Sequence, residues 1–148
     1  MEIKKRLSSI LESPSNHIDE KLLKICQLLD QEYSYFNWTG FYFRNGDKEE
    51  LVLGPYVGAV TDHTVIPFGK GICGQVAVSN ETFVVPDVWE QDNYLACSLD
   101  TKAEIVVPII KDGKNIGQID IDSHTHNPFT AEDREMLEWL CDEIAKKI

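Results

Sequence analysis

A predicted hairpin near the C-terminal helix constrains the fold of this chain more than any other feature. An apolar run, Ile105 to Ile110, precedes Lys111-Asp112-Gly113, and polar and apolar residues alternate after it from Gln118 to Asp122. Two such segments around a Gly-containing turn are typical of two antiparallel strands. A three-residue loop that ends in Gly predicts that Ile110 lies opposite Lys114, and therefore that Glu104 lies beside Asp120. One face of the hairpin is then aliphatic and the other is polar (Ile105, Val107, Ile109, Ile119 and Ile121; Glu104, Gln118, Asp120 and Asp122).

Helical patterns and further strand patterns surround this hairpin. Apolar residues recur at helical spacing in residues 3–11 and 18–29, and Thr130 can cap a last helix that runs to residue 147. Between these helices the sequence predicts a hairpin, two short strands and a short helix (residues 41–56, 65–66, 83–85 and 71–78). Helices at both ends of a meander of strands indicate an α+β fold, with a central antiparallel sheet and helices packed mainly on one face.

Length and composition indicate one globular domain. The chain has 148 residues, of which 43% are hydrophobic and 26% are charged, and these values suit a single core. No linker or repeat divides the sequence, so we expect one domain over residues 1–148. Within it, we expect residues 1–36 to form the N-terminal helices, residues 37–123 the sheet and the site loops, and residues 130–147 the C-terminal helix.

The charge and hydropathy of the chain argue against several kinds of partner. Its formal net charge of −11 at pH 7 repels the phosphates of nucleic acids and of anionic membranes. No apolar run approaches the roughly 18 residues of a membrane span, and the basic N-terminus is not followed by a secretory signal. We therefore expect a cytoplasmic protein with no nucleic-acid or membrane partner, whose thiols stay reduced.

The cysteines fall into two pairs. Cys26 and Cys141 lie on apolar helical stripes, where a thiol acts as a small buried hydrophobe. Cys73 and Cys97 lie in irregular segments beside small residues, and the residues alone leave open whether these thiols are reactive or merely packed.

Two motifs that would indicate a metal or a cofactor are missing or incomplete. No Cys-x-x-Cys is present, and the Gly-x-Gly-x-x-Gly of residues 69–74 lacks a βαβ setting. We expect a tight turn there, and neither a metal nor a cofactor.

Three carboxylates, Glu104, Asp120 and Asp122, share the polar face of the hairpin. Like charges this close repel unless water, a cation or a shared proton relieves them. Two interpretations stay open: a solvated outer face, or the floor of a pocket that binds an ammonium group while one carboxyl keeps its proton. A metal site is the weaker interpretation, because the spacing matches no calcium loop. Trp38 and Tyr42 suit either the core or the wall of a pocket.

A set of sequence blocks, taken together and in order, points to a family. The blocks are Asn37-Trp38-Thr39-Gly40-Phe41-Tyr42, Leu53-Gly54-Pro55-Tyr56, Ile66-Pro67-Phe68-Gly69-Lys70-Gly71-Ile72-Cys73-Gly74, Leu95-Ala96-Cys97, Ala103-Glu104-Ile105-Val106-Val107-Pro108 and Ile119-Asp120-Ile121-Asp122-Ser123. The chain resembles the GAF-domain free methionine-(R)-sulfoxide reductases over most of its length, from about residue 38 to the final helix. The resemblance implies a single GAF-like domain that reduces free L-methionine (R)-S-oxide without a cofactor.

The same resemblance implies a role for each candidate residue. Cys97 matches the cysteine that attacks the sulfoxide, and Cys73 matches a second cysteine able to form a disulfide with it. Trp38 and Tyr42 match the walls around the methyl-sulfur end of the substrate. The carboxylates match those that bind the substrate and protonate its departing oxygen, with Glu104 among the catalytic groups (Glu104, Asp120 and Asp122). Thioredoxin is the implied reductant, and a homodimer the implied assembly.

The chain departs from the family pattern at one place. The family usually carries a third cysteine a few residues before the Ile-Pro step, where this chain has Asp62-His63-Thr64. Two alternatives to the reductase follow from this difference. One is a non-catalytic GAF module that binds a small amino compound, and the other is a redox sensor in which Cys73 and Cys97 form a disulfide without any substrate.

Overall fold

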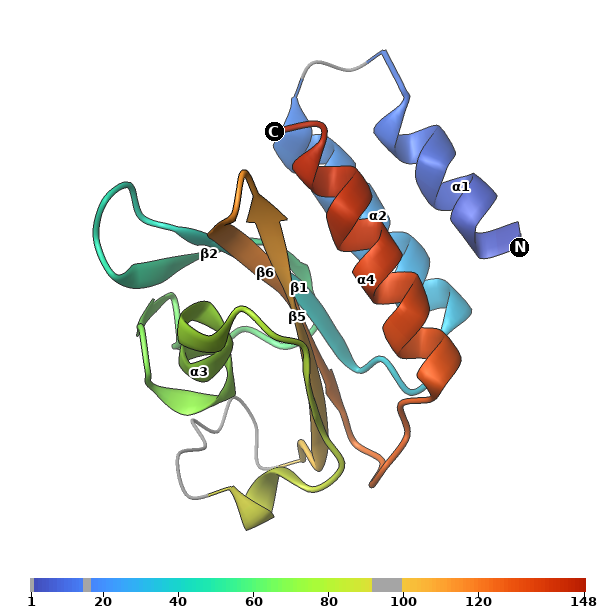
Figure 1. The fold of residues 1–148 in the computed structure, drawn as a ribbon. Coiled ribbons are helices and arrows are strands. Elements are labelled where there is room, and N and C mark those ends of the chain that lie inside the picture. Colours follow the sequence, from blue (N-terminus) through green and yellow to red (C-terminus); the bar gives the residue numbers. More distant parts are fainter. Residues whose placement is uncertain (1, 15–16, 92–99) are drawn as a thin grey trace.

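The computed structural model describes residues 2–14, 17–91 and 100–148, and its centre is a six-stranded antiparallel sheet (Figure 1). The strands lie in the order β3-β2-β1-β6-β5-β4, so the two longest strands are neighbours inside the sheet. Their bounds are β1 Trp38–Arg44, β2 Glu50–Val57, β3 Val65–Pro67, β4 Phe83–Val85, β5 Ala103–Lys111 and β6 Lys114–Ser123.

Three helices cover one face of the sheet and a fourth covers the other (Figure 1). The first group is α1 (Glu2–Leu11), α2 (Ile18–Glu32) and α4 (Ala131–Ala145), and the fourth helix is α3 (Gly71–Ser79). A short 3-10 helix, η1, spans Val88–Glu90. This arrangement confirms the predicted α+β fold with helices mainly on one face. None of the helices within the described ranges is long and apolar enough to cross a bilayer.

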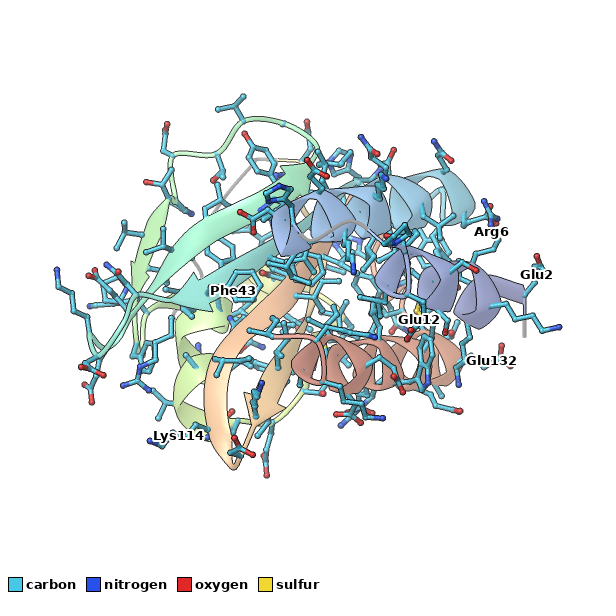
Figure 2. All side chains as sticks on the ribbon, turned by 90° about the horizontal axis from the view of Figure 1, so that it is seen from above. Glu2, Arg6, Glu12, Phe43, Lys114 and Glu132 are labelled. Atoms are coloured by element: carbon cyan, nitrogen blue, oxygen red, sulfur yellow. The ribbon has the colours of Figure 1, made fainter. Side chains whose placement is uncertain are left out.

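The larger hydrophobic core lies between the sheet and the helices α2 and α4, and α1 extends it by packing against the outer side of these two helices. Figure 2 shows the side chains that fill this space, with charged residues such as Glu2 and Glu132 on the outer side of the helices. The aliphatic face of the β5–β6 hairpin is completely covered here, as the alternation predicts. Cys26 and Cys141 are both buried in this core, which confirms their predicted place.

A second, smaller core lies on the opposite face, beneath α3. It is built from the other side of the same strands together with α3, β3 and β4 (Trp38, Tyr42, Leu51, Ile66, Ile72, Cys73, Val76, Ala77, Val85, Val88 and Val106). The short helix is mostly apolar, and six of its nine residues are buried against the sheet and the loops around it.

The predicted register of the β5–β6 hairpin is wrong by two residues. Asp112 and Gly113 both have positive φ, 52° and 79°, as the two-residue turn between Lys111 and Lys114 requires. A β-bulge follows, with Ile109 opposite Gly117. Glu104 therefore pairs with Asp122 instead of Asp120. A shift of two residues preserves the side-chain alternation, so the predicted composition of both faces is correct.

The last helix begins as the sequence predicts. Thr130 accepts a hydrogen bond from the backbone N–H of Asp133 at 3.0 Å, and the Asp133 carboxylate accepts one from the backbone N–H of Thr130 at 3.0 Å. This reciprocal arrangement is a capping box. Tyr35 also donates to Asp133 at 2.7 Å, so the cap links α4 to the segment that follows α2.

Candidate active site

Pairing of the three central strands places the candidate residues in adjacent rows on the face beneath α3. In the first row Trp38 of β1 lies opposite Asp122 of β6, which lies opposite Glu104 of β5. In the second row Asp120 lies between two residues with small or apolar side chains, Gly40 and Val106. Residues two positions apart on a strand share a face, so the rows bring their side chains together. A third row contains Tyr42, Gln118 and Pro108.

The carboxylates of this face are buried, so the interpretation as a solvated outer face is wrong. Glu104, Asp120 and Asp122 are 5%, 1% and 2% exposed, because α3 and the loops around it cover this side of the sheet. Three of these oxygens have no hydrogen-bond partner among the described residues. They are both carboxylate oxygens of Asp122 and Oδ1 of Asp120. Burial of an acceptor without a partner costs free energy. In native proteins such groups occur where a ligand binds or a proton is transferred.

Burial changes the protonation of these groups. It raises the pKa of Asp120, although contacts with Glu104 and Cys73 partly offset the shift. Burial, and after it the charge of Asp120, raises the pKa of Asp122 well above its usual value, while a contact with Glu104 opposes the shift. The cluster therefore holds protons at pH values at which exposed carboxyls have lost them. These directions favour the alternative in which one carboxyl keeps its proton, whereas binding of an ammonium group stays a prediction.

Cys73 lies in the first turn of α3 and points its thiol at this cluster. Its Sγ donates to Oδ2 of Asp120 at 3.1 Å and lies 3.9 Å from Oε2 of Glu104. Its backbone carbonyl accepts a hydrogen bond from Nε2 of Gln118 at 2.9 Å, which ties α3 to β6. Burial and the neighbouring carboxylates raise the pKa of the Cys73 thiol well above its usual value. The thiol therefore acts as a proton donor in the resting protein.

The glycines before Cys73 form the tight turn that the sequence predicts. Gly69 and Gly71 have φ of 87° and 64°, which favour glycine, and lead the chain from β3 into α3. At Gly74 a Cβ atom would lie 2.7 Å from the carbonyl oxygen of Pro67. Close packing of backbone against backbone, and not phosphate binding, therefore explains why this segment contains glycines.

Aromatic side chains from β1 and β2 form one wall beside the acids. The ring of Trp38 stacks on Tyr56 with centroids 5.4 Å apart, and its Nε1 donates to the carbonyl oxygen of Ala59 at 3.0 Å. The hydroxyl of Tyr42 donates to the backbone oxygen of His63 at 2.8 Å. Because both polar ends are bonded to backbone, the two rings present apolar faces with fixed orientation.

Two cavities border the acid cluster. One has a volume of about 10 Å³ and lies among Cys73, Glu104 and Asp120, with His63 and Lys70 also on its border. The other has a volume of about 200 Å³, the space of about seven liquid water molecules at roughly 30 Å³ each. Its lining includes both aromatic and acidic side chains (Asn37, Trp38, Ala59, Asp100, Thr101, Asp122 and His124). Such a cavity suits a small polar molecule with one apolar end.

The structure thus brings together six of the seven residues that the sequence singled out (Trp38, Tyr42, Cys73, Glu104, Asp120 and Asp122). The seventh, Cys97, lies outside the described residues. Sequence reasoning missed Gln118 as the tie to α3, although its place in the polar alternation was visible. It also missed the roles of Tyr56, near a strand end, and His63, in a loop, because isolated residues at such places produce no periodic pattern.

The comparisons with known proteins agree with this geometry. The GAF domain family matches residues 19–148. The free methionine-R-sulfoxide reductase of Saccharomyces cerevisiae is 47% identical over 112 residues, which cover 74% of this chain and 62% of that protein's length. The reductase of the same name from Escherichia coli is 36% identical over 119 residues, covering 80% of this chain and 70% of that one.

A solved structure extends the similarity over nearly the whole chain. The free methionine-R-sulfoxide reductase from Neisseria meningitidis, solved in complex with its substrate, superimposes with a TM-score of 0.89 at 33% identity. The match covers 98% of this chain and 87% of that one. The chain belongs to the GAF domain family and, within it, to the family of the free methionine-R-sulfoxide reductases.

Proposed function

We propose that the protein reduces free L-methionine (R)-S-oxide to methionine. The observation that carries this proposal is the buried cluster of carboxyl groups beside a thiol and an aromatic wall. Reduction of a sulfoxide needs a proton source for the departing oxygen, and a buried acid cluster supplies one at neutral pH. The substrate-bound relative from Neisseria meningitidis gives this proposal its substrate.

The first chemical step belongs to Cys97. Its thiolate attacks the sulfoxide sulfur, the oxygen is transferred to the cysteine as a sulfenic acid, and methionine is released. Glu104 supplies the proton that the sulfoxide oxygen takes up, drawn from those that the cluster retains. Cys97 is thereby oxidised by two electrons while the substrate sulfur is reduced by two.

Asp120 and Asp122 bind the α-amino group of the substrate. An ammonium group next to these carboxyls favours their ionised form, so binding of the amine releases protons toward the oxygen. The carboxyls have acceptor oxygens without partners that such a group would satisfy. A residue within a peptide has no free ammonium group, which accounts for a preference for the free amino acid. Trp38 and Tyr42 enclose the methyl-sulfur end.

Cys73 resolves the sulfenic acid. Its sulfur attacks that of Cys97, and the S–O bond of the sulfenic acid breaks as the disulfide forms. The departing hydroxyl takes up the proton that the Cys73 thiol gives up and leaves as water. The raised pKa of Cys73 disfavours the free thiolate, but Asp120 lies 3.1 Å from its sulfur and can accept the proton as the bond forms. Proton transfer to an adjacent base is the usual way to activate such a nucleophile.

The protein's setting completes the proposal. A dithiol reductant must return the disulfide to two thiols in each cycle, and we assign this role to thioredoxin in the cytoplasm, where thiols stay reduced. We further propose that the protein acts as a homodimer. The exposed outer side of α1 leaves a surface available for such an assembly.

Turnover by purified protein tests the central proposal. Loss of free methionine-(R)-sulfoxide is followed chromatographically with a dithiol reductant present, and the wild type is expected to consume it catalytically. Cys97→Ser is expected to be inactive, and Glu104→Gln to fall by about 10²-fold or more. Cys26→Ala, in the opposite core, is the matched control and should keep full activity. No turnover by the wild type, or full turnover by Cys97→Ser, contradicts the proposal.

A single-turnover experiment tests the resolving step. The reduced protein is mixed with excess substrate without reductant, and its intact mass is measured. A disulfide lowers the mass by about 2 Da, whereas an unresolved sulfenic acid raises it by about 16 Da. We expect the decrease in the wild type and the increase in Cys73→Ser. A wild-type protein that keeps the added oxygen would assign resolution to an external thiol.

A further inference from the structure

Cys73, Glu104 and Asp120 form a compact set of metal-binding atoms. One ligand atom from each, the sulfur and two carboxylate oxygens, lies within 4.8 Å of the others, and all three residues are buried. The set comes from three elements, α3, β5 and β6, so no spacing in the sequence predicts it. Ligand atoms can lie close together without binding a metal, so the set alone does not define a site.

A second observation points to a ligand. Oδ1 of Asp120 is buried and has no hydrogen-bond partner among the described residues. Asp120 borders a cavity of about 10 Å³ together with Cys73 and Glu104. This volume is about the minimum that holds one water molecule, and it is far too small for an amino acid. A buried carboxyl group that keeps an unused acceptor oxygen and borders a cavity of this size suits the binding of a single small ion.

The distances fit one kind of ion. In a tetrahedral zinc site, with bonds of about 2.3 Å to sulfur and 2.0–2.2 Å to oxygen, ligand atoms lie about 3.4–3.6 Å apart. The sulfur of Cys73 lies 3.1 Å from Oδ2 of Asp120 and 3.9 Å from Oε2 of Glu104. Shifts of a few tenths of an ångström bring both distances to the tetrahedral value.

We propose that Cys73, Glu104 and Asp120 bind Zn²⁺, with the fourth position left to water or an added ligand. The thiol loses its proton to solvent on binding, and any carboxyl proton of the set follows it. Thiolate and carboxylate together select zinc over calcium and magnesium, which require six or more oxygen ligands or a shell of water. The cavity has no room for such a shell.

Zinc at this position would inhibit the reductase reversibly. It would occupy the thiol that resolves the sulfenic acid and the carboxyls that bind and protonate the substrate. This consequence rests on the proposed function, whereas the binding itself does not. Zinc should therefore raise the apparent KM for the sulfoxide, and a chelator should restore full turnover.

Metal titration of the reduced, metal-free protein tests the site without any substrate. Zn²⁺ is titrated in competition with a chromophoric chelator, and Cd²⁺ is titrated separately while the ultraviolet thiolate-to-metal band is recorded. One ion per chain is expected, with a thiolate band for Cd²⁺. Excess Mg²⁺ or Ca²⁺ should displace neither ion. Cys73→Ser should lose the band and weaken Zn²⁺ binding by at least tenfold.

Control variants make the result decisive. Cys141→Ala removes an equally buried thiol from the opposite core and should bind Zn²⁺ as the wild type does. Asp120→Asn should weaken binding at least tenfold while far-ultraviolet circular dichroism stays unchanged. A band that survives in Cys73→Ser but is lost in Cys97→Ser overturns the inference, as does the absence of a bound ion. A wild type that turns over substrate yet binds no zinc overturns this inference alone.

Discussion

At the scale of single residues, the main feature is a carboxylate buried at the expense of stability. Asp122 is only 2% exposed at the edge of the larger cavity, and among the described residues no N–H or hydroxyl group donates to either of its oxygens. Its raised pKa shows the same cost. Natural proteins keep such groups where function requires them and offset the cost elsewhere. The stability of the fold and the chemistry of the site therefore make opposite demands on this residue.

Asp122→Asn should stabilise the protein and inactivate it. The neutral amide has the same shape and needs neither a buried negative charge nor an added proton in the folded protein, so we expect the free energy of unfolding at pH 8 to rise by about 1–2 kcal/mol. Activity should fall by about 10²-fold or more. Urea denaturation and the turnover assay measure the two effects. Asp62→Asn, at an exposed position, should change neither. A variant that is both less stable and fully active would contradict this account.

The buried thiols predict how stability depends on pH. Burial raises the pKa of Cys26 to about 12, whereas an unfolded thiol has a pKa of about 8.5. The stability that the protonated thiol contributes is complete below about pH 8.5 and is lost as the pH rises toward its folded value. At pH 10 the loss amounts to about 2 kcal/mol.

Cys26→Ala removes this dependence. The difference in unfolding free energy between the wild type and the variant should shrink by about 2 kcal/mol between pH 7 and pH 10. Urea denaturation at both pH values measures it. Cys141→Ala, at a thiol whose pKa burial also raises, should behave in the same way. A difference that stays constant with pH in both variants would show that these thiols titrate alike in the folded and unfolded chains.

At the scale of secondary structure, helices were predicted better than strand register. The apolar spacing and the cap at Thr130 located α4 to within a few residues, because capping is a local interaction. The register of β5 and β6 depends on a bulge and on positive φ at Asp112. Asp adopts that conformation less readily than Gly, so the sequence favoured the longer loop. The faces were nevertheless correct, because the error was an even number of residues.

The capping box of α4 gives a prediction at this scale. Thr130→Ala removes the side-chain acceptor for the N–H of Asp133 and should lower the free energy of unfolding by about 1 kcal/mol. Thermal or urea denaturation measures the change, and Thr130→Ser should restore most of it. Thr125→Ala, in the exposed loop before the helix, is the control and should change stability little. Equal losses in the two alanine variants would refute a specific role for the cap.

At the scale of the whole molecule, the sheet separates a core that provides stability from a core that contains the site. Side chains of β1, β5 and β6 alternate between the two, so each strand serves both. The sequence predicted the alternation but not that α3 buries the polar face. The contact between α3 and the polar face joins parts of the chain that are far apart in sequence, so no local pattern predicts it. The identity of the site residues came from the resemblance, which spans those distant segments.

Leu7→Ala tests this separation. Leu7 is fully buried in the helix-side core, so its truncation should lower the free energy of unfolding by about 2–5 kcal/mol. The KM for the sulfoxide and the turnover per folded molecule at 25 °C should stay unchanged. Leu23→Ala, at a residue 39% exposed, should change stability by less than about 0.5 kcal/mol. A large change in KM for Leu7→Ala would show that the sheet transmits strain between its faces.

The hydrogen bond from Gln118 to the backbone of Cys73 has an evolutionary consequence. Because the amide holds the main chain and not the thiol, position 73 can exchange its side chain while the helix stays docked. A lineage with this scaffold can therefore gain or lose sulfur chemistry by a single codon change, without first having to rebuild the pocket around it.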